Sequence, residues 1–444
     1  MSSVPERRST SDRQFAEEVV QRLRQAGFVA YWAGGCVRDL LLGKSPKDYD
    51  VATDAPPDAV QELFGYKRTK AVGAAFGVIL IHGPPGLTDI EVATFRAEGP
   101  YLDGRRPEHV VFCTPEQDAL RRDFTINGMF YDPFSEQVLD YVGGQADLQA
   151  RVIRAIGHPE DRFREDKLRI LRAIRFASTM DFLLELHTAT AIREMAADVR
   201  IVSVERITQE WKRMLTHSSR CRALELAHAT RVLPHVFLEA QALLQPDAEV
   251  LWWRSLQAVT SLEHQSVATG LRKEPRFELV LATWLCEAPG YSPQSAETMC
   301  KRLRFSNDEL ERIVWLRAQS QAVHGIRSAS LSQLKRLLAH PFAEDLLAQT
   351  RAVQTAAGRD LADVEFGEIY LRETSREVLD PPALITGDDL IRSGLRPGKA
   401  FKMLLDALRD AQLECRISTP TEAQTLAQEL STQMNVERFK RNKQ

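Results

Sequence analysis

The hydrophobic pattern of this chain changes near Arg151, and this change constrains the fold more than any other feature of the sequence. Before Arg151, short apolar runs alternate with short helical patterns and are separated by Gly- and Pro-rich breaks such as H-G-P-P-G-L. After it, apolar residues recur with helical spacing, as in E-D-K-L-R-I-L-R-A-I-R-F-A, and strand signals almost disappear. The sequence therefore predicts an α+β fold, in which a head with a mixed sheet and helices precedes a long all-α remainder.

The N-terminal part of the chain predicts a definite order of elements. The polar residues 1–12 are expected to be disordered. We expect helices at 15–26, 36–42 and 56–64, and strands at 28–33, 48–53, 77–82 and 89–95. The last two strands flank H-G-P-P-G-L, a spacing that is typical of a hairpin.

Size and composition limit the class of protein. A chain of 444 residues is too long for one compact core, so about two to four domains are expected. No run approaches the roughly 18 apolar residues of a membrane span, and the polar N-terminus lacks the apolar core of a signal peptide. The six cysteines are scattered without a C-x-x-C pair, which argues against a zinc site or a disulfide framework and fits a reducing cytoplasm.

The charge of the chain is nearly balanced, with a formal net charge of −3. The whole surface is therefore not that of a polyanion-binding protein, and any contact with nucleic acid must rest on local patches. The last residues, V-E-R-F-K-R-N-K-Q, form a short basic tail, which is interpreted as a solvated terminus.

Paired glycines followed by paired aspartates form the first chemical motif, A-G-G-C-V-R-D…D-Y-D. Gly34 and Gly35 end a strand and open a helix, where the backbone can approach a phosphate closely, and Arg38 follows one turn later. In an extended chain Asp48 and Asp50 point to the same face, which is unfavourable unless a cation lies between them. Alone, each pair has an ordinary explanation, a tight turn or a solvated acidic turn. Together they predict a triphosphate cradle followed by metal ligands.

A third carboxylate is expected on an adjacent strand, in the run D-I-E-V-A-T-F. The alternation of this run directs Ile90 and Val92 to one face and Glu91 to the other. An unpaired charge in the middle of an apolar strand is costly unless it has a function or lies exposed on an edge strand. Three carboxylates on neighbouring strands suit two Mg²⁺ ions that bridge an attacking hydroxyl and a nucleoside triphosphate.

Two further clusters have the chemistry of nucleotide recognition. In R-R-D-F-T-I-N-G, Arg121 and Arg122 suit phosphate oxygens and Asp123 suits a ribose hydroxyl, the alternative being a plain surface cluster. On the helix predicted for E-D-K-L-R-I-L-R-A, Asp166 and Arg169 lie one turn apart and present an acceptor and a donor fork to a base edge.

The second cluster also has a simpler explanation. The spacing of Glu165 and Arg169 is that of an ordinary helical ion pair. Arg172 and Arg175 continue the same stripe and meet either RNA phosphates or solvent.

In this order and spacing, the motifs resemble those of the class II tRNA nucleotidyltransferases, the CCA-adding enzymes, and of their relatives the bacterial poly(A) polymerases. The matching motifs extend over roughly residues 28–215, and V-S-V-E-R-I-T-Q-E-W is similar to the next helical motif of the family. The resemblance implies a polymerase-β-like nucleotidyltransferase head at 13–150 and a helical neck with the base-recognition helix at 151–215. It further implies an RNA-binding helical body and tail at 216–435, before the basic tail at 436–444.

The resemblance also implies roles for single residues. Asp48 and Asp50 would be the metal ligands, and Asp48, Asp50 and Glu91 the catalytic carboxylates. The expected nucleotide-binding residues are Gly34, Gly35, Arg38, Arg121, Arg122, Asp123, Asp166, Arg169 and Arg172. The implied activity is template-independent addition of CCA to tRNA 3′ ends from CTP and ATP, with Mg²⁺ as cofactor, in the cytoplasm, without a membrane or DNA partner.

Other activities of the same fold stay open as alternatives. Poly(A) addition to RNA and A-only addition to tRNA are not separated from CCA addition by any short motif. V-G-A-A-F-G-V-I lacks the arginines of the poly(A) polymerases, and E-G-P-Y-L-D-G-R-R-P at 98–107 resembles a flexible loop that CC-only enzymes lack. A silent RNA-binding protein would need a damaged carboxylate pair. An antibiotic nucleotidyltransferase would lack the long helical remainder, and no H-D phosphohydrolase motif is present.

Overall fold

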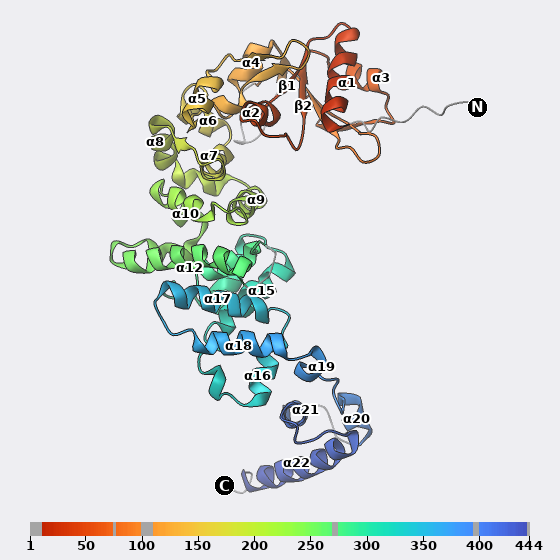
Figure 1. The fold of residues 1–444 in the computed structure, drawn as a ribbon, viewed down its shortest axis with the longest axis vertical. Coiled ribbons are helices and arrows are strands. Elements are labelled where there is room, and N and C mark those ends of the chain that lie inside the picture. The colour runs from red at the N-terminus through yellow and green to blue at the C-terminus, as the bar shows by residue number, and fades with distance from the viewer. Residues whose placement is uncertain (1–10, 74–76, 99–109, 269–273, 394–398, 442–444) are drawn as a thin grey trace, which may run out of the picture. The chain divides into compact units, whose positions relative to one another are not determined.

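The computed structural model describes residues 11–73, 77–98, 110–268, 274–393 and 399–441, and the chain divides into two compact units, Met1–Leu238 and Glu239–Gln444 (Figure 1). Most of the expected disordered N-terminus, residues 1–10, lies outside the described residues. Ser11 and Asp12 are ordered, contrary to the prediction. Ser11 caps helix α1 (Asp12–Gln25) in a capping box with Gln14, and Asp12 accepts hydrogen bonds from Thr88.

Among the described residues, unit 1 contains a sheet of seven strands in the order β3-β4-β5-β2-β1-β8-β9. Its strands are β1 (Ala30–Ala33), β2 (Asp50–Thr53), β3 (Thr69–Gly73), β4 (Val78–Ile81), β5 (Ile90–Thr94), β8 (Phe130–Asp132) and β9 (Gln137–Leu139). Strands β2 and β5 pair in parallel, and the other neighbours pair antiparallel. The predicted hairpin is confirmed as β4 and β5. Strand β5 lies inside the sheet, so the explanation of Glu91 as an edge-strand residue is wrong.

Short helices surround this sheet (Figure 1). They are α1, α2 (Gly35–Leu41), α3 (Pro57–Phe64), α4 (Pro115–Leu120), the 3-10 turn η2 (Thr125–Asn127) and α5 (Gly144–Ala150). Fully buried aromatic residues fill the core, and Phe95 meets Phe130 edge to face at 5.6 Å between ring centroids. Strands β6 (Arg96–Glu98) and β7 (Val110–Phe112) pair with each other. Apart from Glu98, the expected loop at 98–107 lies outside the described residues.

The rest of unit 1 is mainly helical, with two short parallel strands as an exception. It consists of β10 (Val152–Ile153), α6 (Pro159–Glu165), α7 (Leu168–Thr179), β11 (Leu183–Leu184), α8 (Leu186–Glu194), η3 (Ala196–Ile201), α9 (Val204–Leu215), α10 (Arg220–Ala229) and α11 (Leu233–Val236). Helices α7, α9 and α10 pack against one another (Figure 1). The single helix predicted from Glu165 onward is wrong, because the backbone at Asp166 is extended and separates α6 from α7.

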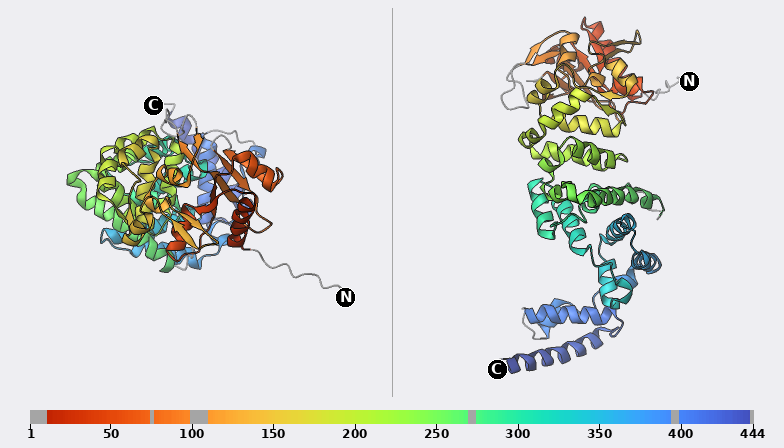
Figure 2. Two further views of the ribbon diagram at one scale, coloured as in Figure 1. Left: turned by 90° about the horizontal axis from the view of Figure 1, so that it is seen from above. Right: turned by 90° about the vertical axis from the view of Figure 1, so that its left-hand side faces the viewer.

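Every regular element described in unit 2 is a helix (Figures 1 and 2). The α-helices are α12 (Glu249–Ala268), α13 (Phe277–Trp284), α14 (Pro293–Arg302), α15 (Asn307–Gln319), α16 (Leu331–Leu338), α17 (Ala343–Ala356), α18 (Ala362–Glu373), α19 (Arg376–Leu379), α20 (Gly387–Arg392), α21 (Lys399–Leu413) and α22 (Pro420–Arg441). Trp252 and Trp284 meet edge to face in its core. Within the described ranges, no helix of either unit has the length and apolar content to cross a membrane.

Candidate nucleotide and metal site

The sheet brings two of the predicted carboxylates together. Asp50 opens β2, and its register partner on the parallel strand β5 is Glu91. Asp48 precedes the strand in a bend, although we expected the strand to begin there. The reason is that β1 ends at Ala33, the partner of Asp50, and turns away at Gly34, while β5 begins at Ile90, only one residue before Glu91. Neither neighbouring strand therefore extends as far as Asp48.

The three carboxylates repel one another. All are exposed to solvent. Desolvation by the surrounding protein and the charges of Glu91 and Asp48 nevertheless raise the pKa of Asp50 to about 6, although the Arg122 guanidinium acts in the opposite direction. A bound cation would relieve this repulsion, so the donor set fits a divalent metal ion.

The protein side chains alone do not complete a metal site. No group of three or more His, Cys, Asp and Glu side chains is placed to hold a metal ion in the ranges that the structure describes. This is the usual situation for Mg²⁺, which takes one or two carboxylates and fills its remaining positions with water and substrate phosphates. The assignment of Asp48 and Asp50 as ligands stays a prediction.

Gly34 keeps the space beside the carboxylates open. Its φ of +72° lies in the region that favours glycine. A Cβ atom there would lie 3.2 Å from Arg122 Nη1 and 4.0 Å from Asp50 Oδ2, and one at Gly35 would lie 3.7 Å from Arg38 Nη2. The paired glycines therefore leave room between an arginine and a predicted metal ligand, as a triphosphate cradle requires.

One buried carboxylate, which our sequence analysis missed, holds both arginines of R-R-D. Asp118 accepts from Nε and Nη2 of Arg121 through one oxygen, and from Nε and Nη2 of Arg122 through the other. An acidic residue three and four positions before two arginines, in a helical pattern, was the available signal.

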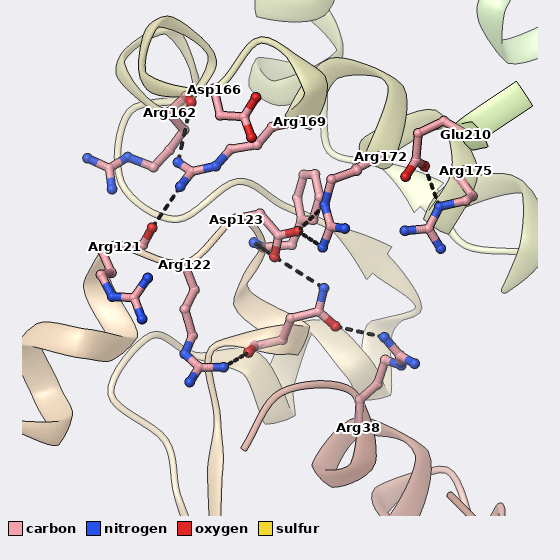
Figure 3. A network of polar contacts seen from close by, with 12 residues as sticks. Arg38, Arg121, Arg122, Asp123, Arg162, Asp166, Arg169, Arg172, Arg175 and Glu210 are labelled. Carbon is pink, nitrogen blue, oxygen red and sulfur yellow. Dashed lines mark hydrogen bonds and ion pairs between the residues drawn. The ribbon is translucent and has the colours of Figure 1, made fainter. Parts of the chain in front are cut away.

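The Asp123 side chain has partners within the protein, and its expected ribose contact stays a prediction. The Asp123 side chain is buried, and its oxygens accept from Arg172, Asn127 and the backbone N–H of Phe124 (Figure 3). Burial would raise the pKa of Asp123, but the Arg172 guanidinium and the amide of Asn127 lower it below its ordinary value. Asp123 and Arg172 thus form an ion pair within the protein.

Asn127 is a second residue that the sequence reasoning missed. Its side-chain oxygen accepts from Arg38 at 2.8 Å, and its side-chain amide donates to Asp123 at 3.2 Å. Its backbone carbonyl accepts from Arg122 at 3.4 Å. Three predicted nucleotide-binding residues, Arg38, Arg122 and Asp123, therefore share this one neighbour.

The predicted base-recognition pair lies at the break between α6 and α7. Asp166 accepts from the backbone N–H of Leu168 and from both terminal nitrogens of Arg206. Arg169, only 8% exposed, donates to Glu165 at 2.7 Å and to the Arg121 carbonyl at 2.9 Å. The simpler explanation, a Glu165–Arg169 ion pair, is thus present, although it spans the break instead of lying on one helix.

These contacts fix Arg169 without using all of its donors. Nη1 also donates to the carbonyl of Arg162 at 3.3 Å. The Nε hydrogen of Arg169 has no hydrogen-bond partner within the described part of the chain. The Asp166 side chain lies next to Arg169 (Figure 3). A donor and an acceptor are therefore held together at this break.

Two family models match the N-terminal part of the chain, the second ending just beyond unit 1. The model described as "Poly A polymerase head domain" matches residues 30–154, and the one described as "Probable RNA and SrmB- binding site of polymerase A" matches residues 181–244. The first covers the sheet and the carboxylates described above, and the second begins after α7.

Proteins of known name and structure are similar to this chain over most of its length. A CCA-adding enzyme of Lactococcus lactis subsp. cremoris (strain MG1363) is 35% identical over 295 residues, 66% of this chain and 68% of that protein. Poly(A) polymerase I of Haemophilus influenzae is 35% identical over 281 residues, 61% of either chain. The crystal structure of a Bacillus stearothermophilus CCA-adding enzyme in complex with CTP aligns with a TM-score of 0.73 at 27% identity, over 96% of this chain and 99% of that one.

Proposed function

Since this chain belongs to the family of class II tRNA nucleotidyltransferases and bacterial poly(A) polymerases, we propose that it adds CCA to tRNA 3′ ends from CTP and ATP without a nucleic-acid template. The observation that carries this proposal is the register of β2 and β5. It sets Asp50 beside Glu91 and next to the Gly34 turn.

The six cysteines are free thiols, which suits a reducing cytoplasm.

We assign the parts of the chain to steps of this reaction. Catalysis belongs to the head at 13–150, base recognition to the neck at 151–215, and RNA binding to the helices at 216–435. The position of the carboxylates supports the first of these assignments, and the Asp166 break supports the second. The family transfers nucleotides with a divalent metal ion, and we propose that this ion is Mg²⁺, held by Asp48 and Asp50.

The head residues orient the triphosphate for in-line attack. The 3′ oxygen of the RNA forms a bond to the α-phosphorus, the bond from that phosphorus to the bridging oxygen breaks, and pyrophosphate leaves. Arg38 and Arg122 bind the phosphates beside the glycines, and Glu91 adds negative charge next to Asp50. When bound, the metal ions activate the attacking hydroxyl and neutralise the triphosphate.

The hydrogen-bonding pattern of the bases explains why CTP and ATP would be selected. Cytosine and adenine both present an exocyclic amino donor next to a ring-nitrogen acceptor. Asp166 can accept from the amino group, and Arg169 can donate to the ring nitrogen. Uracil and guanine present a carbonyl and a ring N–H, the reverse pattern, and would leave both side chains mispaired.

Gly34→Ala is expected to raise the KM for both nucleotides about tenfold, because the new Cβ would enter the space between Arg122 and Asp50. Steady-state kinetics with CTP and with ATP measure this. Gly43→Ala is the matched control, since Gly43 has a similar φ of +70° but no atom within 4 Å of its Cβ position. An equal rise in KM in both variants would mean that backbone strain, and not the cradle, is responsible.

A poly(A) polymerase is the second candidate, and the 35% identity to the Haemophilus influenzae enzyme favours it. An A-only enzyme acting on tRNA is a third. Both would share the head chemistry, so only the products separate them.

The deciding experiment uses purified protein, Mg²⁺ and three tRNA transcripts that end before CCA, after CC and after CCA. Products formed with CTP and ATP, separately and together, are read at single-nucleotide resolution. We expect addition that stops at CCA. Adenylation of only the CC-ended transcript would establish an A-only enzyme, and long adenylate ladders on any RNA would establish a poly(A) polymerase.

A further inference from the structure

We infer that Asp118 is a positioning residue that holds Arg121 and Arg122 together as a phosphate-binding pair. Asp118 lies in α4, the short helix that precedes R-R-D. The inference rests on the proposed function, since it names the part of the head that grips the triphosphate.

The geometry of Asp118 is that of a shared anchor. Its side chain is 1% exposed. Its Oδ1 accepts from Arg121 Nε at 2.8 Å and Nη2 at 2.6 Å, and its Oδ2 accepts from Arg122 Nε at 3.2 Å and Nη2 at 3.0 Å. The backbone N–H of Arg96 donates to Oδ1 at 3.2 Å. Each guanidinium is therefore fixed along one whole edge, which a single contact could not achieve.

The Asp118 carboxylate is ionised beside its two arginines. Burial would raise the pKa of Asp118, but the guanidiniums of Arg122 and Arg121 lower it below its ordinary value, so the carboxylate stays ionised. The side chains of Arg121 and Arg122 are 17% and 18% exposed, so a polyphosphate, an anion that suits guanidinium groups, can reach both of them.

Asp118 also determines which donor of Arg122 is left for a ligand. Because Nε and Nη2 face Asp118, Nη1 is directed toward the Gly34 turn, 3.2 Å from the position that a Cβ of Gly34 would occupy. The contact of Nη1 with the Asn127 carbonyl is long, at 3.4 Å, so a phosphate oxygen can compete for this donor.

The side chain of Asp118 does not contribute directly to the predicted base-recognition pair. Asp118 has no hydrogen bond with Asp166 or Arg169 among the described residues. The link between the two regions is the backbone carbonyl of Arg121, which accepts from Arg169. Loss of the Asp118 charge should therefore weaken phosphate binding while leaving the choice of base unchanged.

The test compares the full-length protein with Asp118→Asn, using pyrophosphate and CTP, each with Mg²⁺, in calorimetric titrations. We expect both Kd values to rise about tenfold or more, because an amide would present N–H groups to a guanidinium. The preference for CTP over UTP should be unchanged. Glu368→Gln is the control: Glu368 accepts from Arg351 at 2.8 Å in unit 2, so this variant also loses an ion pair but should keep wild-type Kd values.

A further variant keeps the test decisive if Asp118→Asn does not fold. Asp118→Asn combined with Arg121→Gln removes one cation along with the anion, and it is compared with Arg121→Gln alone. Pyrophosphate affinity equal in these two proteins, or unchanged in a folded Asp118→Asn, would overturn the inference. Failure of the wild-type protein to extend any RNA would instead overturn the proposed function, whatever the titrations show.

Discussion

Asp50→Asn is expected to lower nucleotide transfer by at least about 10³-fold, equally with CTP and with ATP. The reason is that the metal's stabilisation of transition-state charge is worth several kcal/mol, and about 1.4 kcal/mol corresponds to a factor of ten. Single-turnover assays with saturating tRNA measure the effect on the chemical step. Asp58→Asn is the matched control, since Asp58 is exposed in the first turn of α3 and lies outside the carboxylate group.

The same substitution should stabilise the metal-free protein. The folded state raises the pKa of Asp50 to about 6 from an ordinary 3.8, so it binds a proton more tightly than the unfolded chain does. The ionised carboxylate therefore costs stability above about pH 6, and this cost fades as the pH falls toward 4. At pH 7.5 without metal, the Tm of Asp50→Asn should be higher than that of the wild type by about 1–3 °C.

Magnesium should reverse this order of stability. A cation held by Asp48 and Asp50 binds only the folded state and so raises the Tm of the wild type. Asp50→Asn should respond much less, and Asp58→Asn should respond like the wild type. An equal Mg²⁺-induced rise in all three proteins would show that Asp50 is not a metal ligand.

Local patterns were sufficient to predict the carboxylate face of the sheet. In β5, buried Ile90 and Val92 alternate with exposed Glu91, so the polar face is determined by the strand itself. A slip of one residue in the pairing would have buried Glu91, and the apolar neighbours exclude it. Residues near one another in sequence thus carried enough information to place Glu91 on the same side as Asp50.

Contacts between distant residues account for what the sequence did not predict. The break at Asp166 interrupts a run with good helical periodicity, and Asp166 is held there by Arg206, 40 residues later. The sequence motif around Asp123 likewise did not show that this carboxylate accepts from Arg172, 49 residues later. Local propensities do not indicate which charged residues will form contacts in the folded chain. The motifs therefore predicted the candidate site but not the hydrogen-bond partners of each side chain.

Arg169→Ala is expected to reduce the preference for CTP over UTP about 10- to 100-fold, because a well-placed bidentate contact to a base is worth roughly 1–3 kcal/mol of discrimination. Arg169 is suited to this role since Glu165 and the Arg121 carbonyl fix it while its Nε hydrogen stays unused in the described chain. The measurement is kcat/KM for each of the four nucleotides on a tRNA transcript that ends before CCA.

Arg169→Lys separates the donor fork from the positive charge. Lysine retains the charge but has no planar fork, so its selectivity should fall nearly as far as that of the alanine variant. Arg164→Ala is the control: Arg164 is exposed and, among the residues that the structure describes, its side chain pairs with Asp161 of the same helix alone, so its loss should change neither rate nor selectivity. If Arg169→Ala slows every nucleotide alike and the preference for CTP persists, Arg169 merely supports α4 through the Arg121 carbonyl, and base recognition must lie elsewhere in the neck.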